Sequence, residues 1–233
     1  MESKINRYSK QLILINSFFI LAWLVVSVFP FIWTFWGSFK VKADFFSRAD
    51  WMFAVTGVNT LIETGDTSTV KAYVESWTEG EFWKATMNTI IITVSVVTIS
   101  LFLGTLGAYA LSRSTYKYTF WILIAALIFR AMPHITLVSG YLFPFFQLNV
   151  WGILPTTIIV LVAINQPFTL WLLYSFFKTV PKELDESALI DGCSYFQAFR
   201  YIIMPVMWPG VITAGLFSLM LAYNDFTVTA LLL

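Results

Sequence analysis

The stretch KTVPKELDESALIDGCSYFQAFRYIIMPVMWP, residues Lys178–Pro209, decides how this chain is organised. It is a polar segment set between two long apolar runs, and it carries its own pattern of two short helices. The apolar runs suit a lipid environment, whereas charged and turn-forming residues suit water. The sequence therefore predicts a membrane protein that presents one structured loop to an aqueous compartment.

The first predicted helix of this loop begins near Pro181, because a missing N–H costs nothing in the first turn of a helix. Acidic residues follow in the first turns, where the helix dipole favours anions; they are Glu183, Asp185 and Glu186. Gly192, which follows Asp191, suits the left-handed position that ends a helix. The pattern thus predicts a short acidic helix that stops at a glycine.

The second predicted helix begins at Ser194, because Ser194 and Gln197 have the spacing of a capping box. It is expected to run from Tyr195 to Ile203, until Pro205 interrupts it. A plain amphipathic hairpin lying against the membrane would carry the same capping signals, so these signals alone do not decide the loop's role.

One face of the first helix is expected to hold Glu183 and Glu186, with Ser187 and Ala188 beside them. Small residues permit another surface to approach closely, and acids at the edge attract Arg or Lys. This face is therefore a candidate docking surface for another protein.

The rest of the chain is dominated by apolar residues. Of 233 residues, 58% are hydrophobic and 12% are charged, and the mean hydropathy is +0.77. Only helices or closed barrels satisfy every backbone group in lipid, so we expect an all-α, polytopic helical bundle in a single transmembrane domain over residues 1–233. The predicted spans are about 12–37, 87–111, 119–143, 153–177 and 210–233.

The charged and sulfur-containing residues exclude several other classes. A net charge of +1 gives no argument for nucleic acid as a partner. One cysteine, Cys193, and one histidine, His134, exclude an internal disulfide framework and argue against a metal site. The apolar run that begins at Leu12 is too long for a signal peptide, so it is predicted to be a retained first span.

The distribution of Lys and Arg predicts a cytoplasmic N-terminus. With that orientation the inside segments hold Lys4, Arg7, Lys10, Arg113, Lys117, Lys178, Lys182 and Arg200. The basic residues outside all fall in one long loop, residues 38–86, which also holds many acids. Within it, residues 70–82 are either a short amphipathic helix on the membrane surface or a simple connector. The 178–209 loop is placed inside.

The complete spacing of the 178–209 loop is more specific than its parts, and it resembles the "EAA" loop of ABC-importer permeases. The matching residues are Glu186, Ser187, Ala188, Asp191, Gly192 and Pro205. Ser187 replaces the first Ala of that pattern and Cys193 replaces a small residue, and both are themselves small. Further segments look like the carbohydrate-type permeases, in particular the second maltose permease subunit: Asn88–Arg113, Arg130–Pro133, Pro181–Leu184 and Asn224–Phe226.

This resemblance covers essentially the whole chain and implies a type I ABC importer transmembrane domain in the inner (plasma) membrane. It implies a sugar or sugar-like solute, a second permease subunit as heterodimer partner, two ATP-binding subunits and an extracytoplasmic solute-binding protein. The 178–209 loop would couple to the ATPase subunits through Glu183 and the matching residues above. Such permeases have a sixth span, whereas this chain stops inside its fifth apolar run, so we expect a fragment that lacks the last helix.

The resemblance also implies that this chain is not an enzyme and carries no cofactor, with Mg-ATP on the partner subunits. The sequence agrees, because it contains no G-x-x-x-x-G-K-[ST] phosphate loop. An intramembrane enzyme is disfavoured, because neither H-E-x-x-H nor G-x-S-x-G occurs. An ion-coupled secondary transporter of a small polar solute is the alternative, but five spans without inverted repeats fit it poorly.

Polar side chains inside the predicted spans are the remaining candidates for function. Arg130 lies about midway along the third span and Asp225 in the outer part of the fifth. A charge at mid-membrane costs about 2.5–3.5 kcal/mol on insertion scales, so each is expected to face the bundle interior or water. The two are predicted to approach each other or to share a polar cluster. The other candidates for this cluster are His134, Asn165, Gln166 and Asn224. The cluster is interpreted either as a translocation path or as a set of structural interhelical contacts.

Overall fold

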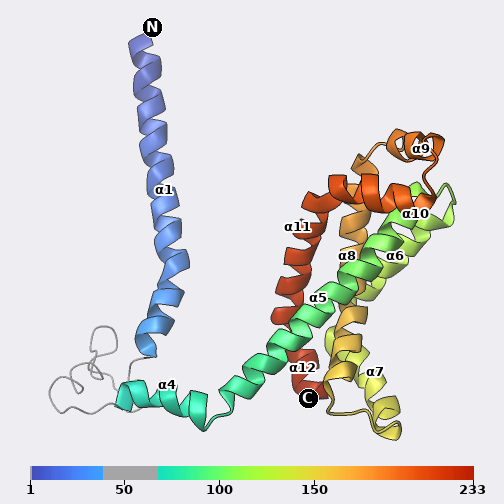
Figure 1. Ribbon diagram of the computed structural model, residues 1–233. Coiled ribbons are helices and arrows are strands. Elements are labelled where there is room, and N and C mark those ends of the chain that lie inside the picture. Colours follow the sequence, from blue (N-terminus) through green and yellow to red (C-terminus); the bar gives the residue numbers. More distant parts are fainter. Residues whose placement is uncertain (1, 39–67) are drawn as a thin grey trace. The chain divides into compact units, whose positions relative to one another are not determined.

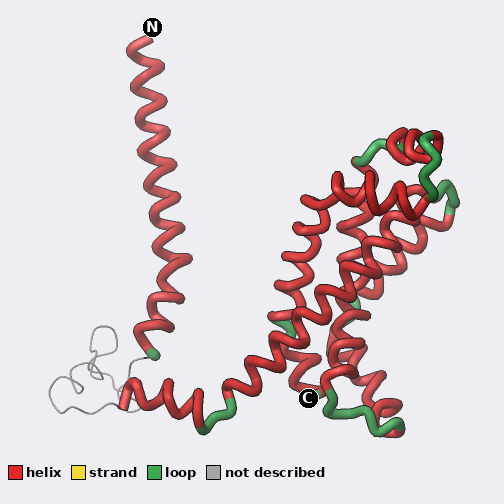
Figure 2. The backbone as a smooth tube through the Cα atoms, viewed as in Figure 1, coloured by secondary structure: helices red, strands yellow, loops and turns green. Residues whose placement is uncertain are grey.

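A computed structural model of the chain describes residues 2–38 and 68–233 (Figure 1). Every regular element in these ranges is a helix, which confirms the predicted all-α class (Figure 2). Four helices are long and apolar enough to cross a membrane, and the number rises to five if one bent pair counts as a single span. The chain divides into two units, Met1–Trp83 and Lys84–Leu233, which are described separately.

The first unit contains α1 (Glu2–Gly37) and α4 (Ser68–Thr78). Within the described residues of the first unit, the apolar part of α1, Leu12–Phe35, is not buried. An apolar surface of this length suits lipid or another membrane helix. The helix α4 overlaps the predicted 70–82 surface helix; most of the outside loop, residues 39–67, lies outside the described residues.

The second unit is built around α8 (Leu154–Thr179), which packs against α6 (Tyr118–Ala131) and α11 (Met204–Tyr223). Two apolar clusters form its core. One joins α8 to α5 (Phe82–Arg113), α7 (His134–Gln147) and α12 (Phe226–Leu232). The other surrounds Leu173 and Phe177, toward the other end of α8. In Figure 1 this end of α8 lies next to α9 (Glu183–Ile190).

The third predicted span, 119–143, is not one straight helix. The helices α6 and α7 are bent by 89° at the break between Ala131 and His134. Met132 is extended, with ψ 139°, because the residue before a proline is driven away from the helical region. Pro133 is therefore the cause of the break, and α7 continues to Gln147, beyond the predicted end.

The fifth predicted span, 210–233, differs from the observed helices at both ends. It begins earlier, because α10 (Tyr195–Ala198) continues through a π-helical turn, Phe199–Ile203, into α11. The prediction that Pro205 interrupts the helix is therefore wrong. A proline ring clashes with the carbonyl four residues earlier, here that of Tyr201, and this residue lies within the widened π turn.

Near its other end this span breaks at Asn224, and α12 begins at Phe226. The side chain of Asp225 accepts a hydrogen bond from the Val228 N–H at 2.8 Å and so caps the new helix. Aspartate is among the best residues for this position, which explains why the helix restarts there.

Candidate functional site

The 178–209 loop contains two short helices, α9 and α10, joined by a tight turn. The helix α9 begins at Glu183, two residues after Pro181, and ends before Gly192. Gly192 has φ +88°, its N–H donates to the Leu189 carbonyl at 3.1 Å, and the Cys193 N–H donates to the Ala188 carbonyl at 3.0 Å. This is the Schellman arrangement, and it confirms the prediction of a left-handed glycine at the helix end.

The predicted capping box is also present. The Ser194 N–H donates to Gln197 Oε1 at 2.7 Å, and the Gln197 N–H donates to Ser194 Oγ at 3.3 Å. Both ends of the turn are therefore satisfied by local hydrogen bonds. We call α9, the turn at Gly192 and α10 together the elbow. Its shape is set by residues adjacent in sequence.

The inner face of α9 is formed by Asp185 and Ala188, whose exposed fractions are 8% and 1%. They lie three residues apart and so share one face of the helix. The expectation that Ala188 lies on an outer docking face beside Glu183 and Glu186 is wrong. Ala188 instead faces the rest of the same chain, and its small methyl group allows α9 to pack closely there.

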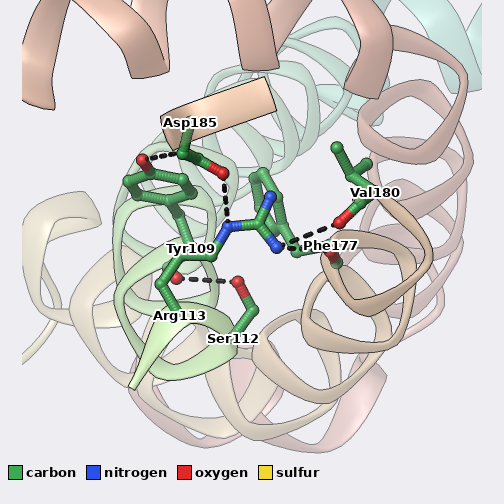
Figure 3. A network of polar contacts seen from close by, with 6 residues as sticks. All are labelled: Tyr109, Ser112, Arg113, Phe177, Val180 and Asp185. Atoms are coloured by element: carbon green, nitrogen blue, oxygen red, sulfur yellow. Dashed lines mark hydrogen bonds and ion pairs between the residues drawn. The ribbon is translucent and has the colours of Figure 1, made fainter. Parts of the chain in front are cut away.

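Asp185 is held by two side chains from the last turns of α5 (Figure 3). The Tyr109 hydroxyl donates to Asp185 Oδ1 at 2.5 Å. Arg113 Nε lies 2.8 Å from Asp185 Oδ2, as a close ion pair rather than an aligned hydrogen bond. The ring of Tyr109 also packs on Phe177 and Phe199, with ring centroids 5.7 and 4.8 Å apart.

Arg113 reaches a third element at the same time. Its Nη1 donates to the carbonyls of Phe177, at 3.3 Å, and Val180, at 3.1 Å (Figure 3). The last carbonyls of a helix lack the usual donor from the next turn. Arg113 therefore supplies a donor to the Val180 carbonyl and a second donor to the Phe177 carbonyl, which also accepts the Val180 N–H at 3.2 Å. Sequence reasoning treated Asp185 only as an acid near a helix start and missed Tyr109 and Arg113. The signal that could have found them is the basic residue at the end of the second apolar run.

The outer face of α9 presents acids together with one large apolar side chain. Ile190 is 86% exposed, the highest value of any large hydrophobic residue in the described ranges. The other exposed residues of this face and turn are Glu183, Glu186, Ser187, Asp191 and Gly192. Pro205, in the first turn of α11, is exposed as well. This surface combines one exposed apolar side chain with surrounding acids. Its complement is a groove that has an apolar pocket and basic residues around it.

A second candidate site lies where the two helix breaks meet. Arg130 and His134 flank the break between α6 and α7, while Asn224 and Asp225 form the break between α11 and α12. All four line one cavity of about 460 Å³, together with Phe168 and other residues. The structure thus brings four of the six predicted cluster residues together.

Asp225 in this cavity pairs with His134 rather than with Arg130. Asp225 Oδ2 lies 3.1 Å from His134 Nδ1. The guanidinium of Arg130 lies over the Phe168 ring, 5.6 Å from its centroid, and its Nη1 is buried without a hydrogen-bond partner among the described residues. Arg130 and Asp225 line the same cavity, and they form no ion pair with each other in the described part of the chain.

Asn165 and Gln166 lie apart from this cavity. Asn165 is 3% exposed within α8, and Gln166 lines a separate cavity of about 420 Å³ with Phe129 and Tyr141. Consecutive residues on a helix point in directions about 100° apart, so one face of α8 cannot present both. The predicted six-residue cluster is therefore two or more distinct groups.

The break at Asn224–Phe226 also borders a smaller cavity of about 310 Å³ on another side. Its polar lining holds the carboxylate of Asp225 together with hydroxyl and amide groups from Thr89, Thr93, Asn224 and Thr229. Neutral groups of this kind donate and accept hydrogen bonds without requiring an ion. The helix break therefore borders two cavities that both have polar residues in their lining.

Residues 100–233, more than half of the chain, match the family described as "Binding-protein-dependent transport system inner membrane component". The chain belongs to this family of permeases. The match begins within α5 and includes both the elbow and the helix breaks.

Two curated permeases illustrate the similarity. The chain is 29% identical to the diacetylchitobiose uptake system permease protein NgcG of Streptomyces coelicolor, over 89% of this chain and 65% of that protein. It is 32% identical to the trehalose/maltose transport system permease protein MalG of Thermococcus litoralis, over 93% of this chain and 73% of that protein. The chain thus spans about two thirds of the length of the curated permeases that it matches.

A solved structure of a bacterial ABC transporter, involved in the import of the acidic polysaccharide alginate, has the same fold. The TM-score is 0.73 at 22% identity, over 94% of this chain and 74% of the other. This agreement confirms the predicted fold of an ABC-importer permease. It also agrees with the multi-pass membrane character of the chain.

Proposed function

We propose that this chain is the permease subunit of an ATP-driven, binding-protein-dependent importer of a sugar or sugar-like solute. The observation that carries the proposal is the elbow: α9 is pinned to the membrane helices on one face and exposes Ile190 among acids on the other. The matched family and the sugar permeases among its relatives support the class. In this proposal α9 lies in a groove of a separate ATPase subunit.

The proposed assembly contains two ATP-binding subunits, which carry the Mg-ATP, a second and different permease subunit, and an extracytoplasmic solute-binding protein. The chain forms a single transmembrane domain with its N-terminus and the 178–209 loop in the cytoplasm. Closure of the ATPase dimer would draw the elbows together and switch the helices between inward-facing and outward-facing states, largely as rigid bodies. The coupling residues are those of the outer face and turn: Glu183, Glu186, Ser187, Asp191 and Gly192, with Ala188 and Pro205 shaping the elbow.

The solute path is proposed to pass the cavity at the helix breaks. Broken helices leave backbone carbonyls available, and His134, Asn224 and Asp225 add side-chain groups that suit sugar hydroxyls. Aromatic rings from Phe168 and Phe217, which pack edge to face at 5.9 Å, form an apolar wall suited to a sugar ring. Arg130 completes the polar side of this cavity.

The docking proposal is tested in the full-length subunit, assembled with its partners in lipid nanodiscs. Ile190→Asp and Glu186→Lys are expected to reduce co-purification of the ATPase subunit and solute uptake by at least tenfold. Tyr116→Asp is the matched control, because Tyr116 is 78% exposed but lies outside the elbow. Normal docking and uptake in Ile190→Asp and Glu186→Lys would show that the elbow does not bind the ATPase.

The solute path is tested by Asn224→Ala in the same complex. This variant is expected to raise the solute concentration needed for half-maximal uptake, while ATPase docking stays normal. Ser139→Ala, an exposed α7 side chain that lines neither cavity at the helix break, serves as the control. An unchanged half-maximal concentration in Asn224→Ala would place the path elsewhere.

A further inference from the structure

One side chain, Arg113, connects three elements that are distant in sequence. It belongs to the last turn of α5, its Nη1 binds the carbonyls of Phe177 and Val180 at the end of α8, and its Nε pairs with Asp185 of α9 (Figure 3). Tyr109, one turn earlier on α5, also contacts both α8 and α9, through the Phe177 ring and the Asp185 carboxylate.

These contacts are shielded from water. The side chains of Arg113 and Asp185 are 15% and 12% exposed, so salt screens their attraction much less than it screens a surface ion pair. The second oxygen of Asp185 accepts the Tyr109 hydroxyl, and the Tyr109 ring is packed against Phe177 and Phe199. The carboxylate is therefore fixed on both oxygens, and α9 cannot rotate without breaking both contacts.

The pinned face of α9 is opposite the exposed one. Asp185 is buried, while Glu183, Ser187 and Ile190 are exposed. At about 100° per residue, Glu183, Ser187 and Ile190 all lie more than about 130° around the helix from Asp185. A force applied to the exposed face is therefore received by the Asp185 contacts behind it.

We propose that Arg113 is a positioning residue that makes α9 and the adjoining ends of α5 and α8 move as one body. This inference rests on the proposed docking of α9 on an ATPase subunit. Displacement of α9 is then transmitted to two membrane helices at once. Within the described residues the hydrogen bonds and ion pair of Arg113 reach α8 and α9. The helix α6 follows through its packing against α8, and α7 through its packing against α12.

The geometry of these three contacts requires arginine and would not be satisfied by another cationic side chain. A guanidinium presents several N–H groups in a rigid plane, so it can serve the two carbonyls and the carboxylate together. A lysine ammonium is a single point of charge on a flexible stem and cannot occupy both positions. Arg113→Lys keeps the charge and removes the connection, which makes it the most informative variant.

The test uses the full complex in nanodiscs and measures solute molecules transported per ATP hydrolysed, together with the amount of ATPase subunit bound. Arg113→Lys and Asp185→Asn are expected to keep the ATPase bound and to lower the transport ratio at least fivefold. Tyr109→Phe, which removes one hydrogen bond and keeps the ring, is expected to lower it about twofold. Arg200→Lys is the matched control, because Arg200 is exposed and lies in the 178–209 loop, as Asp185 does. The transport ratio of this variant is expected to equal that of the wild type.

A wild-type transport ratio in Arg113→Lys and Asp185→Asn would overturn the inference. The same holds if these variants only reduce the amount of bound ATPase while the remaining complexes keep the normal ratio, because that is a purely structural effect. If Asp185→Asn fails to fold, Tyr109→Phe decides by the same measurement. Failure of the proposed function is distinguishable, since cross-links from position 190 to the ATPase would then be absent in the wild type as well.

Discussion

Substitution of Gly192 tests whether the end of α9 depends on a left-handed backbone. Gly192 has φ +88°, and a Cβ built there meets nothing within 4 Å. The cost of Gly192→Ala is therefore a backbone cost without a steric clash, about 1–2 kcal/mol for an L-residue in the left-handed region. An increase of this size in the free energy of the closed turn raises its open fraction roughly 5- to 30-fold.

Amide hydrogen exchange measures this opening directly. The Cys193 N–H donates to the Ala188 carbonyl at 3.0 Å and is exposed to exchange when the turn opens. Gly192→Ala should accelerate exchange of this amide by the 5- to 30-fold factor given above. Gly192→Asn should have a smaller effect, because asparagine tolerates this backbone region better than alanine.

Gly152→Ala is the matched control for this measurement. Gly152 has φ +74° and equally open surroundings, but it lies in the turn before α8, next to the carbonyl of Leu232. It should carry a similar backbone cost and leave exchange at Cys193 unchanged. The reasoning is refuted if Gly192→Ala leaves the Cys193 exchange rate at its wild-type value, or if Gly152→Ala accelerates it equally.

Further predictions concern stability, measured as the free energy of unfolding of the purified subunit. Leu173→Ala should lower it by about 2–5 kcal/mol, because Leu173 is fully buried, whereas Ile190→Ala should change it by less than about 0.5 kcal/mol. Gly210→Ala should lower it by about 1–3 kcal/mol, because the added Cβ would lie 2.8 Å from Cγ of Phe176; equal stability would show that α8 and α11 can separate freely. Asp225→Ala should cost about 1 kcal/mol through loss of the α12 cap, and Asp225→Asn distinctly less; equal losses would assign the effect to the His134 contact.

The features predicted correctly are those that depend on neighbours in sequence. The turn at Gly192 and the capping box at Ser194 need only residues within a few positions, so their hydrogen bonds could be anticipated. The apolar content likewise determines an all-α membrane class, since lipid offers no partners to the backbone. The break at Pro133 had a local signal as well, because proline restrains the residue before it.

The errors concern features that depend on packing between distant segments. Whether Ala188 faces outward or inward is decided by what lies against α9, and the partner residues on α5 are more than seventy positions away. The π turn before Pro205 depends on where the helix must point after the elbow, which no short pattern encodes. The division of the six polar candidates between different cavities depends on helix rotation, which hydropathy does not specify.

The amino-acid order by itself determined that the chain crosses a membrane as helices and that an acidic, glycine-terminated elbow interrupts them. Both follow from interactions of each residue with solvent or with its near neighbours. Only the tertiary structure decided that Asp185 faces inward to Tyr109 and Arg113, and that His134 rather than Arg130 meets Asp225. These contacts form between helices, and their energy depends on distances that exist only once the bundle has packed.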